Sequence, residues 1–217
     1  MGYKNWMRAE LKRVRMVEEI EKQFDLSPYI KKAFLEVNRQ LFVPTGFGHI
    51  AYQLDALPMQ QNQWISSPLT VAKMTQHLKV EGVDTVLEIG CGSGYQAAIL
   101  SKLCRRVFTI ERIDSLLKEA KERFRKEGLN NIFTRFDDGQ RGWKSYAPYD
   151  RILFSATAKK IPEVLFEQLA EGGILLAPIE KNGLQIITRF YKRHGKIRSE
   201  SIEPCLFVPI VDGRVKR

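Results

Sequence analysis

The sequence predicts an α/β fold built on a doubly wound, mostly parallel sheet, with a helical and loop-rich segment before it and an antiparallel extension after it. Two patterns indicate this fold. From residue 84 onward, short apolar runs alternate with longer helical ones, which is typical of a parallel sheet covered by helices on both faces. Three closely spaced glycines also follow the first apolar run, where such sheets turn from strand to helix.

Residues 3–40 are expected to form helices, because apolar side chains recur there with helical spacing. Ser27 precedes Pro28, an order typical of a helix N-terminus. Residues 44–68 break this pattern. They are rich in Gly, Pro, Gln and Asn and predict a long ordered loop or an arm with short strands, a kind of segment that is usually functional. Residues 69–80 return to a helical pattern.

The chain from residue 84 indicates alternating strands and helices. The expected strands are residues 84–90, 106–111, 131–136, 149–156 and 174–179, and the expected helices are residues 95–103, 115–128 and 162–173. Residues 184–202 alternate around a His-Gly pair, which predicts an antiparallel hairpin. Residues 205–210 are expected to form a last strand.

The length of 217 residues fits a single domain with appendages. The expected segments are a helical segment with a site loop over residues 1–80, a ligand-binding core over residues 81–180 and a C-terminal extension over residues 181–217. No apolar run approaches the roughly 18 residues of a membrane helix. The first 20 residues carry scattered charges, unlike a secretory signal. We expect a cytoplasmic protein, without a membrane partner and monomeric.

Cysteine usage and charge exclude some classes of site. Cys91, Cys104 and Cys205 are odd in number and widely spaced, so they predict neither a disulfide framework nor a zinc site, and no metal is expected. The formal net charge of +10 would suit nucleic acid or an acidic partner. Lys and Arg are spread along the whole chain, usually beside Glu or Asp, which is typical of solvated helix surfaces. Nucleic acid is therefore the less favoured partner.

The three glycines of the first turn, Gly90, Gly92 and Gly94, lie where ligands approach the backbone of such a sheet. A phosphate-binding P-loop would continue with Lys and Ser or Thr, whereas this turn continues with Tyr-Gln. Gly92, Gly94 and Ala97 do satisfy the Rossmann-like G-x-G-x-x-A spacing, so a nicotinamide dinucleotide stays an alternative at this point.

Acidic residues at the ends of successive strands favour a different ligand. Glu88 precedes the glycines, and a carboxylate there would repel a pyrophosphate but suit a cation. Glu111 ends the second strand, where carboxylates accept hydrogen bonds from ribose hydroxyls. Asp137 and Asp138 follow the third strand, and one of them could accept the exocyclic amine of adenine. Each would also suit a turn or a cap. Together they predict a site for S-adenosylmethionine, which carries a sulfonium and an ammonium group.

A longer resemblance includes these motifs. The segments that carry it are "LFVP", "AYQLDALP", "WISSP", "VLEIGCGSGYQAAILSKL", "DDGQRGW", "PYDRILFSATAKKIPEVLFEQLAEGGILLAPI" and the terminal "FVPI". Across most of its length the chain resembles the protein-L-isoaspartate O-methyltransferase family. The resemblance implies the Rossmann-like fold of class I methyltransferases and methyl transfer from S-adenosylmethionine to the α-carboxylate of L-isoaspartyl residues in damaged proteins. The resulting ester cyclises to a succinimide, which allows repair toward aspartate.

The resemblance also implies site residues. Ser66 is expected to be the active-site residue, whereas Ser67, just before Pro68, is assigned to the cap of the next helix. The residues expected to bind the methyl donor are Gln63, Trp64, Ile65, Glu88, Gly90, Cys91, Gly92, Ser93, Gly94, Glu111, Arg112, Asp138 and Gly139.

The implied chemistry explains why no catalytic histidine is expected. His49, His77 and His194 lie far apart in sequence and in unlike contexts. A carboxylate acceptor, with a pKa near 4, is already deprotonated at neutral pH and needs no general base. Ordering two reactants can supply roughly 7–11 kcal/mol of the barrier. We therefore expect groups that orient the carboxylate and a cover that excludes water, with residues 44–68 as that cover.

The acceptor side departs from the family pattern. Gln60, Asn62 and Trp64 stand where the family commonly has two glycines and a threonine. The segment after Ala-Tyr has Gln53 and Leu54 in place of an acidic pair, and Val211 replaces a threonine near the C-terminus. The donor site is therefore expected to be conventional. The acceptor pocket is expected to be altered, with reduced activity on standard isoaspartyl peptides.

Two alternative functions stay open at this point. An RNA or DNA methyltransferase would suit the basic charge, but adenine-amine enzymes usually place an Asn/Asp-Pro-Pro-aromatic motif after the fourth strand, where this chain has "FSATAKK". A module that binds the donor with little turnover is the other alternative.

Overall fold

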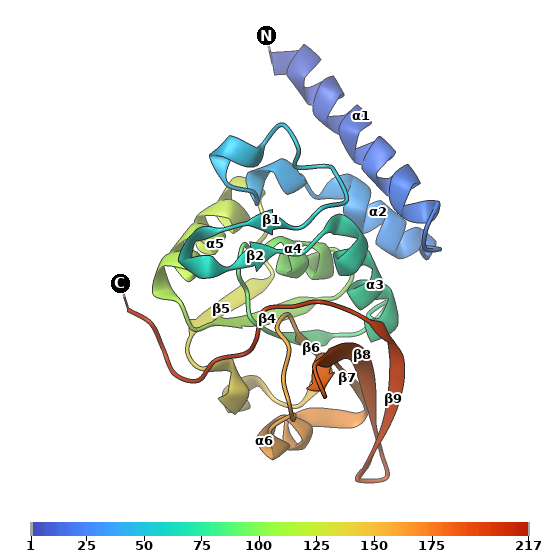
Figure 1. Ribbon diagram of the computed structural model, residues 1–217, viewed down its shortest axis with the longest axis vertical. Helices are drawn as coiled ribbons and strands as arrows, with labels where there is room; N and C mark the ends of the chain where they lie inside the picture. Colours follow the sequence, from blue (N-terminus) through green and yellow to red (C-terminus); the bar gives the residue numbers. More distant parts are fainter. Residues whose placement is uncertain (1, 217) are drawn as a thin grey trace.

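The computed structural model describes residues 2–216, with side chains from residue 9 onward; the ends of the expected terminal segments, Met1 and Arg217, lie outside it. A seven-stranded sheet forms its centre, in the order β5-β4-β3-β6-β7-β8-β9 (Figure 1). The strands are β3 (Thr85–Ile89), β4 (Arg106–Glu111), β5 (Ile132–Phe136), β6 (Tyr149–Phe154), β7 (Leu169–Lys181), β8 (Leu184–Arg193) and β9 (Lys196–Pro204). Strands β3 to β7 are parallel and β8 and β9 are antiparallel, so the predicted fold class is confirmed.

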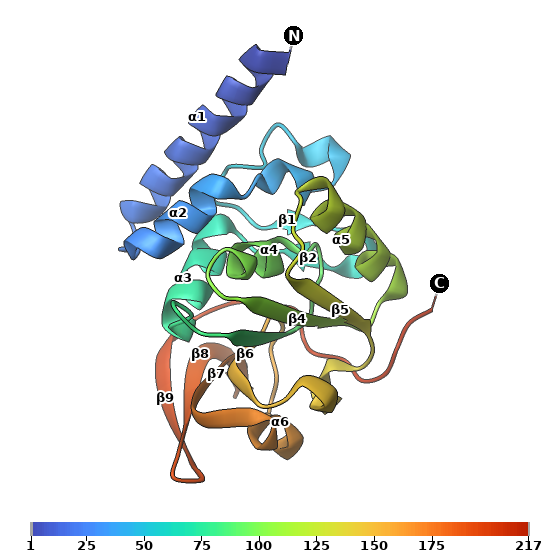
Figure 2. The ribbon, with the colours of Figure 1, turned by 180° about the vertical axis from the view of Figure 1, so that it is seen from behind.

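Helices cover both faces of the sheet, as Figures 1 and 2 show. The helices are α1 (Gly2–Glu21), α2 (Pro28–Glu36), α3 (Pro68–Leu78), α4 (Tyr95–Ser101), α5 (Asp114–Lys126) and α6 (Glu163–Glu167). Helices α3, α4 and α5 lie on one face with α1 and α2 outside them, and α6 lies on the other face. Along β3, Val86 packs into the core under α4, whereas Leu87 and Ile89 pack into the second core. None of the helices within residues 2–216 is long and apolar enough to cross a membrane.

Residues 44–68, before the sheet, form an ordered loop with short strands, as expected. It contains the 3₁₀ turns η2 (Thr45–Phe47) and η3 (Gln60–Asn62) and the two-residue strands β1 (Leu57–Pro58) and β2 (Trp64–Ile65). The 3₁₀ turn η1 (Arg39–Leu41) precedes this loop. The two strands pair antiparallel, Pro58 with Trp64. The Ser67 hydroxyl accepts the Thr70 amide at 3.0 Å and Pro68 begins α3, so the predicted cap is confirmed. We call residues 57–66 the arm.

Two expected elements are wrong. The helix expected over residues 162–173 ends at Glu167, because Leu169 already pairs with Tyr149 in the sheet and Gly172 has a left-handed φ of 76°. Residues 205–210 form no strand and make only one isolated bridge, between Pro209 and Thr157. A proline without an N–H cannot continue a ladder there. Residues 205–216 form an irregular segment that we call the strap.

The glycine turn predicts one effect on stability. Gly94 has a φ of 88°, and a Cβ added there would lie 2.6 Å from the Phe124 ring. For Gly94→Ala we expect a loss of about 2–4 kcal/mol in the free energy of unfolding, because backbone strain and overpacking add. Gly128→Ala is the matched control, with a φ of 69° and open space around the added Cβ, and should lose only about 1 kcal/mol. Urea unfolding measures both, and equal losses would contradict the packing argument.

Candidate functional site

A cavity lies at the carboxyl ends of strands β3 to β6, between the glycine turn, the arm and the strap. This is the edge at which open α/β sheets bind ligands. It brings together 13 of the 14 residues that the sequence analysis selected. They are Gln63, Trp64, Ile65, Ser66, Glu88, Gly90, Cys91, Gly92, Ser93, Glu111, Arg112, Asp138 and Gly139.

The glycine turn presents bare backbone to this cavity. Gly92 has a φ of 51°, and a Cβ added to it would meet no atom within 4 Å, so the chain is open there on the cavity side. The Gly90 amide donates to the Ile110 carbonyl at 2.9 Å, which anchors the turn to β4. Gly94 does not line the cavity: it precedes α4 and packs against Phe124. Its place in the structure is that of a packing glycine.

Glu111 ends β4 and fixes the shape of the turn. Its side chain is buried, and one carboxylate oxygen, Oε2, accepts the Gly92 amide at 2.8 Å. The other oxygen, Oε1, accepts the Ile113 amide at 3.0 Å. Burial raises the pKa of Glu111, and these amide donors partly offset the shift. Each carboxylate oxygen keeps a lone pair beyond these bonds, so the group can accept further donors from the cavity.

Glu88 lies fully buried on β3 beneath the turn. Thr109 donates its hydroxyl to Glu88 Oε2 at 2.6 Å, and Ser155 donates to Oε1 at 3.2 Å. Burial outweighs both bonds and raises the pKa of Glu88 to about 8, and the nearby Glu111 adds to the shift. The carboxyl group therefore carries little negative charge at neutral pH until a cation comes close. The sequence predicts a carboxylate at this position, and the burial that raises its pKa is visible only in the fold.

The strap is hydrogen-bonded to two of the residues that are predicted to bind the methyl donor, Asp138 and Arg112. Asp138 Oδ1 accepts the Gln140 amide at 3.0 Å, which caps the turn η4 (Gly139–Arg141), and Oδ2 accepts the Gly213 amide at 2.9 Å. The Arg112 Nε donates to the Gly213 carbonyl at 2.9 Å. Asp137 instead pairs with Arg135 at 2.6 Å and does not line the cavity.

The arm carries the candidate acceptor residues over the cavity. The Ser66 hydroxyl makes no hydrogen bond to a described residue, whereas its carbonyl accepts Arg39 Nη2 at 3.0 Å. Trp64 stands beside it with 55% of its surface exposed. Ser66 can therefore donate its hydroxyl to a bound carboxylate, and Trp64 lines the same cavity.

The structure adds lining residues that the sequence analysis missed. They are Thr70, Val71, Met74, Ile89, Tyr95, Gln96, Ile110, Ile113, Leu116, Ser155, Ala156 and residues 207–210 of the strap, and Val211, named above on the acceptor side, lines the cavity beside them. Ser155 directly follows β6, so the rule that ligands bind at carboxyl ends of strands could have found it. Residues 207–210 had no such signal, because the motif "FVPI" does not show where the chain returns.

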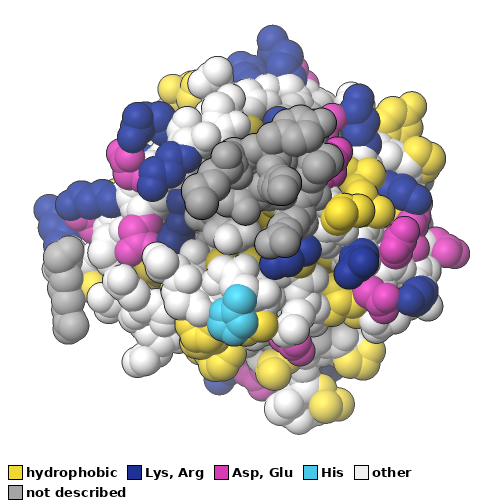
Figure 3. All heavy atoms as spheres, turned by 90° about the horizontal axis from the view of Figure 1, so that it is seen from above, with side chains coloured by type: hydrophobic (Ala, Val, Ile, Leu, Met, Phe, Trp, Pro, Cys, Tyr) yellow, Lys and Arg dark blue, Asp and Glu magenta, His cyan; other side chains and the backbone are white. Residues whose placement is uncertain are grey.

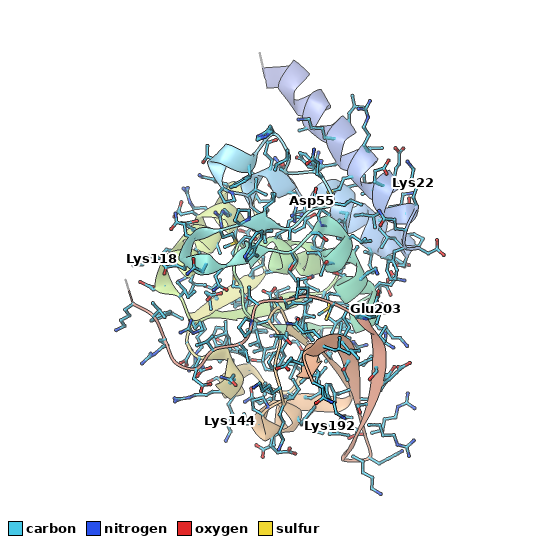
Figure 4. All side chains as sticks on the ribbon, viewed as in Figure 1. Lys22, Asp55, Lys118, Lys144, Lys192 and Glu203 are labelled. Carbon is cyan, nitrogen blue, oxygen red and sulfur yellow. The ribbon has the colours of Figure 1, made fainter. Side chains whose placement is uncertain are left out.

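The described histidines lie away from the cavity. His77 on α3 contacts at 2.9 Å the carboxylate of Glu203 on β9, which Figure 4 labels, and neither residue lines the cavity. Neither His49 nor His194 lines the cavity. Within the described part of the chain, no group of three His, Cys, Asp or Glu side chains could hold a metal ion.

The chain is similar to known proteins of one family over most of its length. The family model of protein-L-isoaspartate(D-aspartate) O-methyltransferase matches residues 11–215. The protein-L-isoaspartate O-methyltransferase of Helicobacter pylori (strain J99) is 58% identical over 199 residues, which cover 91% of this chain and 95% of the relative. The protein of the same name from Dictyoglomus thermophilum is 42% identical over 201 residues, which cover 93% of this chain and 91% of the relative.

Solved structures show the same likeness. A protein-L-isoaspartate O-methyltransferase structure matches with a TM-score of 0.83 at 26% identity, over 92% of this chain and 66% of that chain, just under two thirds of its length. A structure from Plasmodium falciparum, in complex with S-adenosyl-L-homocysteine, matches with a TM-score of 0.82 at 21% identity, over 91% of this chain and 97% of that chain. At 21% identity, this second match shows a shared fold only.

The raised pKa of Glu88 predicts a pH dependence of stability. The folded protein holds the Glu88 proton up to about pH 8, whereas an unfolded chain releases it near pH 4.5, so the folded state binds more protons between these values. The contribution of Glu88 to the free energy of unfolding therefore falls as pH rises through this window. Glu88→Gln cannot ionise, and its urea titrations should show a shallower fall, by up to about 1.4 kcal/mol per pH unit.

The difference in slope between wild type and Glu88→Gln reports on Glu88 alone, because Glu111, whose pKa is also raised, is present in both proteins. An exposed carboxyl gives the matched control. Glu122 lies on the surface of α5 beside Arg125, and Glu122→Gln should keep the wild-type slope in this window. Parallel profiles for Glu88→Gln and wild type would show that Glu88 is ionised in the folded protein.

Proposed function

The chain belongs to the protein-L-isoaspartate(D-aspartate) O-methyltransferase family, and we propose that it transfers a methyl group from S-adenosylmethionine to the α-carboxylate of L-isoaspartyl residues in damaged proteins or peptides. The observation that carries the proposal is the cavity itself, which has the acid-lined glycine turn on one side and the arm with Ser66 on the other. A donor and an acceptor can meet in it. The proposal includes two further expectations from the sequence, a cytoplasmic location and a monomeric state.

The residues present fit the donor. The turn is bare at Gly92, which lets a ligand lie against the backbone. Glu111 would accept the ribose hydroxyls with the lone pairs that the Gly92 and Ile113 amides leave unused. Asp138 would accept the adenine amine. Glu88 would face the cationic groups, and a nearby positive charge would lower its raised pKa and favour its ionised form.

S-adenosylmethionine supplies a methyl group on a sulfonium, which passes to a carboxylate oxygen as the carbon–sulfur bond breaks. No proton leaves the acceptor, so the chain needs no base in this step. Its residues have to hold the carboxylate in line and keep water away. Ser66 would donate a hydrogen bond that orients the carboxylate, and the arm and strap would cover the reacting groups.

The face of the molecule shown in Figure 3 and the segment after β6 support a peptide acceptor better than a nucleic acid. On the face shown in Figure 3, Lys and Arg side chains stand at several separate places with Asp and Glu beside some of them. Electrostatic binding of nucleic acid favours clustered basic side chains. The segment after β6 reads Ser-Ala-Thr, without the motif that grips a flipped adenine.

An isoaspartyl peptide and its aspartyl twin test the proposal. With labelled donor, we expect the label on the isoaspartyl peptide alone. Glu111→Ala should weaken binding of S-adenosylhomocysteine by about 10-fold or more, because it removes charged acceptors. Ser66→Ala should keep that affinity and lower kcat by about 10-fold, because the acceptor loses orientation. Equal labelling of the two peptides would refute the repair assignment.

Matched controls separate these effects from general damage. Glu122→Ala changes an exposed carboxylate on α5, and Ser199→Ala changes an exposed hydroxyl on β9. Neither residue lines the cavity, so both variants should match wild type in donor affinity and kcat.

Trp64 gives a separate prediction about the acceptor. Trp64→Thr installs the residue common in the family and opens space beside Ser66, so kcat/KM for a standard isoaspartyl peptide should rise by about 3- to 10-fold. Tyr29→Thr is the control, because Tyr29 is 68% exposed on α2 and does not line the cavity. A fall in kcat/KM for Trp64→Thr would instead mean that the indole contributes to acceptor binding.

A further inference from the structure

A buried arginine connects the two sides of the site. Arg39, the first residue of η1, is fully buried although it does not line the cavity. Its Nε donates to the Ala51 carbonyl at 2.8 Å and its Nη2 donates to the Ser66 carbonyl at 3.0 Å. Its guanidinium carbon lies 4.5 Å from the centre of the Tyr95 ring. One side chain therefore contacts the arm and the helix that follows the glycine turn.

This cation has no acidic partner among the side chains that the structure describes. The two carbonyls and the Tyr95 ring offset its charge, and burial lowers its pKa. Burying a charge without a counter-ion is unfavourable, and an apolar residue of similar size often serves stability equally well or better. The contribution of Arg39 is therefore to geometry, since a planar guanidinium directs its donors along fixed lines.

The two groups that Arg39 joins belong to opposite reactants of the proposed transfer. Ser66 lines the acceptor side of the cavity, and its hydroxyl is unbonded within the described chain. Tyr95 begins α4 directly after the glycine turn and lines the donor side. Arg39 is the only described side chain that donates to the Ser66 carbonyl, so it directly links the backbone at Ser66 to the Tyr95 ring.

The backbone around Arg39 is itself held in place. The preceding residue, Asn38, donates its amide to Glu127 Oε1 at 2.8 Å. Its side-chain oxygen accepts the Gln40 amide at 3.2 Å and the Tyr52 hydroxyl at 2.7 Å. The arginine thus projects from a turn that is fixed to the end of α5, so it can transmit a defined position to the arm.

We propose that Arg39 is a positioning residue for methyl transfer, which holds the Ser66 backbone at the distance from the glycine turn that aligns acceptor and donor. This inference rests on the proposed function. Arg39 touches neither reactant and acts through Ser66. Misplacing a reacting group by about 1 Å can lower a rate by roughly 100-fold, so a loosened arm should affect turnover before it affects donor binding.

The test compares Arg39→Met and Arg39→Lys with Arg189→Met. Arg189 is also buried, on β8, where it donates to the His77 carbonyl at 2.8 Å and pairs with Glu200 at 3.1 Å. It lies outside the cavity lining. Unfolding by urea, affinity for S-adenosylhomocysteine, kcat and KM for an isoaspartyl peptide, and amide hydrogen exchange are measured for each protein.

We expect Arg39→Met to keep donor affinity within about 3-fold and to lower kcat by about 10- to 100-fold. Its amides at residues 63–66 should exchange faster, while those at residues 90–94 keep the wild-type rate. Arg39→Lys keeps the positive charge but has a single donor nitrogen, so its kcat should lie between those of Arg39→Met and wild type. Arg189→Met should keep wild-type kcat.

Other outcomes overturn the proposal. Wild-type kcat in a folded Arg39→Met, or equal losses of kcat in Arg39→Met and Arg189→Met, would mean that Arg39 does not position the site. If Arg39→Met fails to fold, Arg39→Lys decides: wild-type kcat and exchange at residues 63–66 would refute positioning. A wild-type protein that methylates neither peptide would refute the proposed function instead, and hydrogen exchange and donor affinity would still report on Arg39.

Discussion

The hydrogen bond from the Gly92 amide to the Glu111 carboxylate is the contact on which the site depends. It joins the turn after β3 to the end of β4 at 2.8 Å, inside a buried environment where a lost partner would be costly. The same carboxylate holds the Ile113 amide and so sets the start of α5. Because β3 and β4 are parallel, their carboxyl ends lie at the same edge of the sheet, and the Glu111 carboxylate fixes the shape of the turn at that edge.

Two segments distant in sequence complete what the sheet begins. The arm, which precedes the seven-stranded sheet in sequence, lies over the cavity. The strap, which follows β9 in sequence, returns to the same cavity. Neither segment has a regular element longer than three residues, so side chains and backbone contacts hold them. Asp138 and Arg112 bond the strap at Gly213, and Arg39 bonds the arm at Ser66. The cover of the site is therefore held by these polar contacts together with the packing of buried Leu57 and Ile65 and of partly buried Phe207 against the core.

Burial controls the charges near the reacting groups. Glu88 and Arg39 are both fully buried, and desolvation moves each pKa toward the neutral form. Their situations differ. Glu88 lines the cavity, where a cationic ligand can reverse the shift. Arg39 lies behind the arm, where carbonyls and an aromatic ring surround it. One group can respond to the ligand, and the other keeps a fixed geometry.

The sequence by itself determined the alternating core, the glycine turn, the Ser67 cap and nearly all of the turn and arm residues around the cavity. The core, the turn and the cap depend on local spacing, which a linear pattern records, whereas the arm residues followed from the family resemblance. It assigned Gly94 to the ligand, because spacing cannot distinguish a glycine that faces a cavity from one that faces Phe124. It also extended the helix before β7, since helical periodicity does not reveal that Leu169 pairs with Tyr149.

Only the tertiary structure decided where the strap returns, how far Glu88 is desolvated and what Arg39 contacts. Each of these depends on groups that are far apart in the chain: Gly213 and Asp138, Glu88 and Ser155, Arg39 and Ser66. Hydrogen bonding and desolvation depend on which groups lie close together in the folded protein, whatever their separation in sequence. A sequence pattern carries the local preferences of the backbone, and the packed fold alone sets which distant polar groups meet and how much water reaches them.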